Sequence, residues 1–101
     1  MPEKKCEVRG NTLIASGDFS KDADTGFDEA CQKLLFKTDG DLVVDMTRVT
    51  RVCSTYVGLL AELCLGAKSR GRKLVIRAGA KVAGALRDAG LDHAAALEEV
   101  G

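Results

Sequence analysis

The sequence contains few of the residue types on which several common classes of protein depend. Its 101 residues include four aromatic side chains, one proline, one histidine and no tryptophan. None of the four cysteines stands in a Cys-x-x-Cys pair, so the ligand spacing of a zinc site is absent. We therefore expect neither a metal ion nor another cofactor.

Net charge and long apolar runs are also missing. Fifteen basic and fifteen acidic side chains cancel, so no overall field attracts the chain to nucleic acid or to anionic lipid. No apolar run approaches the roughly 20 residues that span a bilayer. The charged segment from Met1 to Cys6 does not lead into the apolar core of a signal peptide. We expect a cytoplasmic protein that does not bind nucleic acid and does not insert directly into a membrane.

The composition is that of a globular domain with a modest core. Hydrophobic residues make up 46% of the chain and charged residues 30%, and the length fits one domain over residues 1–101. Cys31 and Cys64 fall on the apolar faces of expected helices, where a cysteine acts as a small core residue. Reduced thiols are therefore expected.

Local patterns predict strands that alternate with helices. Strands are expected at residues 6–9, 12–16 (continuing toward Phe19), 42–44 and 73–77, and helices at 25–37, 55–70 and 80–89. Residues 45–52 are expected to form a polar connection. The tail over residues 91–101 stays open between a helix and a short edge strand ending at Val100. The order β-β-α-β-α-β-α plus a C-terminal tail predicts an α/β fold, with helices packed against a mixed, mostly parallel sheet.

The candidates for catalysis are weak. Cys53 and Ser54 are nucleophile types and His93 is the one side chain of the usual base type, but no Gly-x-Ser-x-Gly elbow or orienting group accompanies them. A basic cluster lies at the end of the second expected helix, where cations complement the helix dipole; it comprises Lys68, Arg70, Arg72 and Lys73. We expect no enzyme and no catalytic residue.

Two hydroxyl side chains mark the expected start of the second helix. Ser54 or Thr55 is expected to be its N-cap, with the hydroxyl oxygen accepting a bond from a backbone amide of the first turn. The same position suits a phosphate, because the amides and the positive end of the helix stabilise a dianion. Arg48 or Arg51 would add a charge-assisted contact.

At this point the sequence resembles the STAS family, and in particular its anti-sigma factor antagonists. Their pattern is a strand followed by Asp-Ser-Ser-Gly or Asp-Ser/Thr-x-Gly at the head of a helix rich in Leu and Gly. The corresponding run here is Cys53-Ser54-Thr55-Tyr56-Val57-Gly58-Leu59-Leu60. The likeness covers about residues 12–91 and includes Gly17-Asp18-Phe19, which resembles the Gly-Glu-Leu corner of the family.

The resemblance implies a regulatory, protein-binding module of bacterial transcription that switches partners. The unmodified antagonist binds an anti-sigma factor that is also a serine kinase. Phosphorylation ends the binding, and a phosphatase restores it. On this matching Ser54 is the phosphorylated residue and Thr55 the hydroxyl beside it. The implied partner-binding residues are Asp18, Cys53, Ser54, Thr55, Tyr56, Gly58 and Leu59.

Two departures from the family pattern leave other functions open. Cys53 stands where the family has an acidic residue, and Tyr56 stands where it has a glycine. Tyr56 is either part of an apolar docking patch with Leu59 or an ordinary, partly buried helix residue. Residues 47–52 also resemble a loop of the STAS subunits of cytoplasmic ABC-type lipid-transport complexes, which bind an ABC transporter ATPase. An unphosphorylated signalling scaffold is a further alternative.

Overall fold

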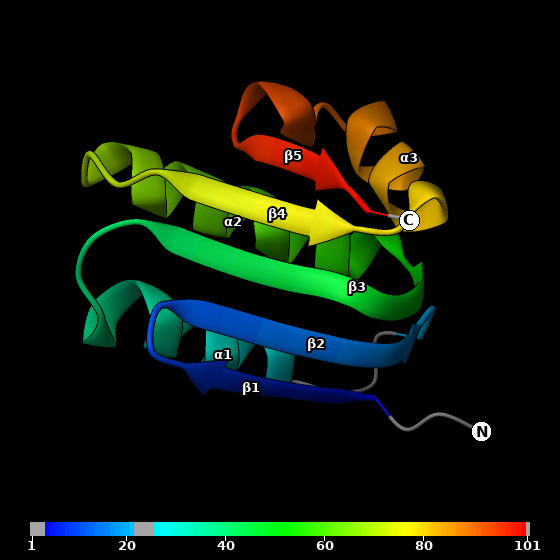
Figure 1. Cartoon of the computed structure of the whole chain (residues 1–101), viewed down its shortest axis with the longest axis horizontal. Coiled ribbons are helices and arrows are strands. Elements are labelled where there is room, and N and C mark those ends of the chain that lie inside the picture. The colour runs from blue at the N-terminus through cyan, green and yellow to red at the C-terminus, as the bar shows by residue number, and fades with distance from the viewer. Residues whose placement is uncertain (1–3, 22–25, 101) are drawn as a thin grey trace.

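The protein is an α/β sandwich of one five-stranded sheet and a helical layer, in a computed structural model that describes residues 4–21 and 26–100. In chain order the elements are β1 (Lys5–Arg9), β2 (Thr12–Phe19), α1 (Gly26–Lys37), β3 (Leu42–Val52), α2 (Ser54–Ser69), β4 (Leu74–Ala78), α3 (Ala80–Asp88), the 3-10 helix η1 (Leu91–His93) and β5 (Ala96–Glu99). The strands lie in the order β1-β2-β3-β4-β5 (Figure 1). The predicted α/β class and order of elements are confirmed.

The helices cover one face of the sheet. β1 is antiparallel to β2, and the other neighbouring strands are parallel. In Figure 1 α1 and α2 lie behind the sheet, and the face toward the viewer is not covered by a helix. Burial alternates along β2 accordingly, with Leu13, Ala15 and Phe19 among the fully buried residues. Within the described residues no helix is both long and apolar enough to cross a membrane.

The second half of β3 differs from the prediction. Residues 45–52 were expected to form a connection, but β3 continues through Val52 and pairs with β2 as far as Phe19. The pairing shifts register between Ile14 and Ser16 and again between Gly17 and Asp18. Irregularities of this kind turn the strand, so that buried side chains need not alternate. Apolar residues therefore recur every third position, at Met46, Val49 and Val52, which is not the pattern of a regular strand.

The C-terminal tail forms an edge strand, the second of the two alternatives that the sequence left open. β5 pairs in parallel with β4, and the amide of Val100 donates to the carbonyl of Ala78 at 2.8 Å. Two ion pairs bind this strand to the rest of the chain, Arg77–Glu98 at 3.4 Å and Arg87–Glu99 at 2.6 Å. Elsewhere the element ends differ from the prediction by one to three residues; Thr25, the expected start of the first helix, lies outside the described residues.

Candidate functional site

The junction between β3 and α2 differs in detail from the predicted capping. Cys53, and not Ser54 or Thr55, occupies the N-cap position, with extended backbone angles (φ −98°, ψ 171°) and no hydrogen bond from its side chain to the helix. Its carbonyl accepts the first helical bond, from the amide of Val57 at 3.2 Å. Its own amide donates to the carbonyl of Phe19 at 2.9 Å, which fixes the start of the helix against the end of β2. Ser54 is therefore the first residue of the helix itself.

The residues that follow divide between surface and core. Ser54, Thr55 and Gly58 are exposed, whereas Cys53 and Leu59 are half-buried. Positions four apart lie on the same side of a helix, so Gly58 continues the surface that begins at Ser54. These five predicted partner-binding residues are thus brought together at one end of α2.

Tyr56 is not part of this surface, contrary to its predicted place in a docking patch. Its side chain has no exposed area. It packs edge-on against Phe19 and Phe27, with ring centroids 4.9 and 5.4 Å away. Three of the four aromatic residues of the chain thus form one cluster beneath the start of α2. The tyrosine anchors the end of the helix to the core, while its neighbours Ser54, Thr55 and Gly58 stay exposed.

Lys4 completes this cluster, and the sequence offered no signal for it. Its Nζ donates to the hydroxyl of Tyr56 at 2.7 Å and to the carbonyl of Lys21 at 2.9 Å. The same atom lies 5.0 Å from the centroid of the Tyr56 ring, within the range of a cation–π interaction. The pairing spans 52 residues of sequence, so only the folded chain shows it.

An ion pair borders the site at the ends of β2 and β3. Arg51 Nη2 lies 2.7 Å from Asp18 Oδ2, and the amide of Ser20 donates to Asp18 Oδ1 at 2.9 Å. Hydrogen bonding by Ser20, followed by that of Arg51, lowers the pKa of Asp18 from 3.8 to about 2. The carboxylate is therefore charged throughout the physiological range, and it orients the guanidinium three residues before Ser54.

Arg48, the other arginine considered for a phosphate contact, lies elsewhere. It pairs in register with Ser16 on β2 and borders an open cavity of about 720 Å³ together with Lys5 and Ile14. Arg51, in contrast, lies opposite Asp18 in the sheet and also forms an ion pair with it. Of the two candidates, Arg51 is therefore the cation placed beside the predicted site.

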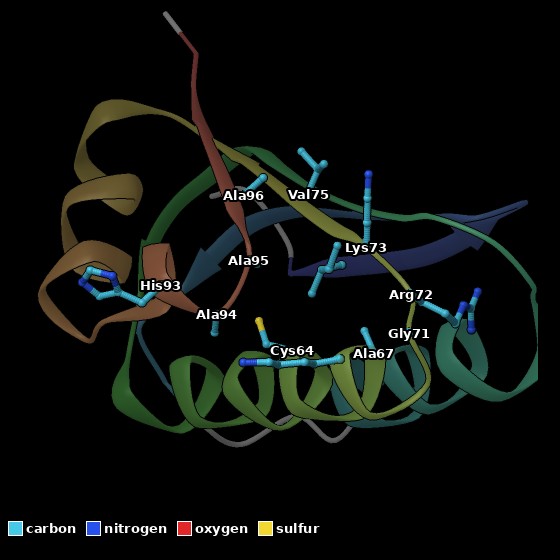
Figure 2. Close-up of a pocket in the computed structure, with 12 residues that line it drawn as sticks. Cys64, Ala67, Gly71, Arg72, Lys73, Val75, His93, Ala94, Ala95 and Ala96 are labelled. Carbon is cyan, nitrogen blue, oxygen red and sulfur yellow. The ribbon is translucent and has the colours of Figure 1, made fainter.

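A groove of about 510 Å³ lies between α2 and β5, away from Ser54 (Figure 2). Small side chains line much of it, among them Cys64, Ala67 and Ala94. The basic residues at its border do not converge: Lys73 points away from α2, and Arg72 points toward α1, where it donates to the carbonyls of Gly40 and Leu35. Three residues of the basic cluster, Lys68, Arg72 and Lys73, thus border the groove without pointing to one place, and Arg70 lies against the ring of Phe36.

The side chains considered for nucleophilic chemistry are also separated. His93 and Cys64 both border the groove, but the His93 ring points away from Cys64 (Figure 2). Cys64 lies ten residues and about 15 Å along α2 from Ser54. Burial raises the pKa of the Cys64 thiol to about 11 and that of Cys31 to about 12, so both thiols stay protonated at neutral pH. Both are core residues, as their positions in the sequence indicated.

Comparison with known proteins identifies the family. The family model described as "Mlab, STAS domain" matches residues 7–99. No curated protein matches the chain significantly. The matched stretch includes every described strand and helix except the first two residues of β1, and so includes the whole of the candidate site.

Proposed function

The chain belongs to the STAS family of protein-binding regulatory domains, and we propose that it is a cytoplasmic anti-sigma factor antagonist controlled by phosphorylation of Ser54. The observation that carries the proposal is the exposure of Ser54 at the first position of α2, beside the exposed residues Thr55 and Gly58. The partner would be an anti-sigma factor with serine kinase activity. We propose a binding role without catalysis by this chain itself.

The electrostatics of the site support a phosphate at Ser54. Backbone amides of a first helical turn have no acceptor within the helix, and the positive end of the dipole favours a dianion. Arg51 is close in sequence and already oriented by Asp18. A phosphate on Ser54 would compete with Asp18 for this guanidinium and place two negative charges on the docking surface. We expect this to weaken partner binding by about 2–3 kcal/mol, or roughly 30- to 150-fold.

Gly58 supports a docking role for the same surface. A methyl group built on its Cα would meet no atom of the described residues within 4 Å, so their packing does not require glycine there. A glycine within a helix costs about 1 kcal/mol relative to alanine. We propose that the absent side chain lets a partner approach the backbone of α2 closely.

Phosphorylation is tested by incubating the chain with the candidate kinase and ATP, followed by mass spectrometry. The proposal predicts one phosphate on the wild type, the same on Thr55→Ala, and none on Ser54→Ala. Phosphate on Thr55 alone would move the switch to the neighbouring hydroxyl. No phosphate on either residue would contradict the switch.

A second function is a subunit role in an ABC-type lipid-transport complex, favoured by the cysteine at position 53. A family antagonist carries an acidic residue there, whereas Cys53 is a cap without a side-chain bond. Residues 47–52, which resemble that group's loop, form the exposed end of β3 in this fold. In such a complex Ser54 would be a permanent interface contact, and no kinase would be needed.

Co-purification with a tagged chain from the native organism separates the two functions. A histidine-kinase-like ATPase supports the antagonist, and an ABC ATPase supports the transport subunit. Gly58→Leu is the matched control, because its side chain would block the proposed surface without disturbing the core. A partner that still binds this variant uses a different surface.

A further inference from the structure

The outer side of the helical layer carries the exposed apolar side chains of the molecule. Among the described residues the large hydrophobic side chains that are exposed are Phe36 on α1, at 59%, and Leu65 on α2, at 66%. In both helices the residues that face the sheet are buried, so Phe36 and Leu65 project on the opposite side. Exposed apolar side chains on an otherwise polar surface mark a site of association.

The two residues flank the contact between α1 and α2. Leu35 packs against the backbone at Gly66, where a built Cβ would lie 2.6 Å from Leu35 Cδ2. One turn further along α2, the guanidinium carbon of Arg70 lies 4.7 Å from the centroid of the Phe36 ring. These two contacts join α1 to α2 between the exposed side chains, and we call the five residues the seam patch (Leu35, Phe36, Leu65, Gly66 and Arg70).

The charges around the seam patch are separated by sign along the helices. Glu29 lies in the first turn of α1, and Glu62 lies ahead of Leu65 on α2. Cations follow later in the sequence of both helices, and these are Lys33 and Lys37 on α1 and Lys68 and Arg70 at the end of α2. The ion pairs among the described residues all lie elsewhere, in β1, in η1, and on the strands β2 to β5 with α3. These exposed charges are thus available to a second molecule.

The direction of the helices makes this surface complementary to itself. α1 joins the parallel strands β2 and β3, and α2 joins the parallel strands β3 and β4, so the two helices run in the same direction. On each helix the acidic residue precedes the basic ones, Glu29 on α1 and Glu62 near the middle of α2. A two-fold axis across the helical layer reverses the second copy, so that these acidic residues of each copy face the basic residues of the other.

We propose that the seam patch is the interface of a symmetric homodimer with antiparallel helices. The second copy covers Phe36 and Leu65, and Glu29 and Glu62 of each copy face Lys33 and Lys37 of the other. Complementarity of charge selects a second copy of this chain over a uniformly acidic or basic partner. The proposal is independent of the function of Ser54, because it concerns the chain alone.

Sedimentation equilibrium of the full chain over a series of concentrations tests the proposal. A reversible monomer–dimer equilibrium is expected, with a dissociation constant of about 1–100 µM that rises with salt concentration. The double variant Phe36→Ala/Leu65→Ala should raise this constant at least about tenfold. Both side chains are exposed, so the fold is retained, which far-UV circular dichroism checks. A wild type that remains monomeric, or a dimer indifferent to the double variant, would overturn the proposal.

A charge exchange tests the antiparallel arrangement. Lys37→Glu should weaken the dimer, and the double exchange Glu29→Lys/Lys37→Glu should restore it in part, because the lysine introduced at position 29 then faces the glutamate introduced at position 37, while Lys33 and Glu62 keep their charges. The matched control is Lys81→Glu, the same change at an exposed position of α3 outside the seam patch, which should leave the dimer unchanged. Failure of the double exchange to restore the dimer would contradict the arrangement.

Discussion

The two ends of α2 differ in how far contacts within the chain explain the residues found there. Around the C-terminal end, internal contacts explain the residues: Leu35 fills the space at Gly66, and Arg72 donates to Gly40, Leu35 and Thr38. At the N-terminal end Ser54 and Gly58 are exposed, and no described residue fills the space beside Gly58. Residues that the fold does not require are the better candidates for contact with a partner.

The N-terminal end of α2 itself has a buried inner side and an exposed outer side. Tyr56 lies between Ser54 and Gly58 in sequence, yet it is buried against Phe19 and Phe27. Its ring and hydroxyl hold the helix start in place from below. Binding and stability are therefore expected to respond to different substitutions within the same turn of helix.

Tyr56→Ala should have the largest effect on stability. Removing a buried aromatic side chain costs about 3–5 kcal/mol of unfolding free energy. Tyr56→Phe keeps the ring and loses the bond with Lys4, so about 1 kcal/mol is expected. Chemical denaturation of the two variants measures the difference. Equal losses would mean that the hydroxyl, and not aromatic packing, anchors the helix.

Arg72→Ala should have the next largest effect, because it removes the hydrogen bonds that join the end of α2 to α1. The guanidinium lies 2.7 Å from the carbonyl oxygen of Gly40 and 2.8 Å from that of Leu35. A loss of about 2–3 kcal/mol is expected in denaturation experiments. Arg70→Ala is the control: it removes an exposed contact with Phe36 and should cost less than about 1 kcal/mol.

Much of the fold was predictable because it depends on local patterns. The helices have a clear apolar periodicity and glycines beyond their ends, and β4 is a short apolar run with a glycine on either side. The second half of β3 was not predictable, because register shifts against β2 replace alternation with apolar residues every third position. The local sequence contains no sign of those shifts.

The candidate site was predictable in position but not in detail. Hydroxyl residues before an apolar helix indicate its start, and they lie there in the structure. The identity of the cap depends on where β3 ends, and the burial of Tyr56 depends on rings from β2 and α1. These are tertiary contacts between distant segments. A sequence pattern around Ser54 does not contain them.

Alanine at the two glycines of α2 compares its two ends directly. Gly58→Ala should raise the unfolding free energy by up to about 1 kcal/mol, since the new methyl group meets nothing. Gly66→Ala should not show this gain, because Leu35 must move to admit the methyl group. Thermal denaturation measures both. An equal gain in the two variants would show that Gly58 and Gly66 do not differ in how closely they are packed.

The smallest effect concerns the ion pair that borders the site. NMR titration should find the Asp18 carboxyl with a pKa of about 2, below its ordinary 3.8. A lowered pKa means that the associated stabilisation is complete above about pH 4 and is lost as the pH falls through about 2. Arg51→Ala should raise this pKa without restoring 3.8, because the hydrogen bonds with Ser20 remain. An unchanged pKa in the variant would show that Arg51 is not oriented by Asp18.

The central claim is that the exposed start of α2 is a docking surface controlled at Ser54. Its most direct test is isothermal titration of the co-purified partner with the unmodified chain and with the chain phosphorylated at Ser54. Phosphorylation is expected to weaken binding roughly 30- to 150-fold. Equal dissociation constants for the two forms would contradict it.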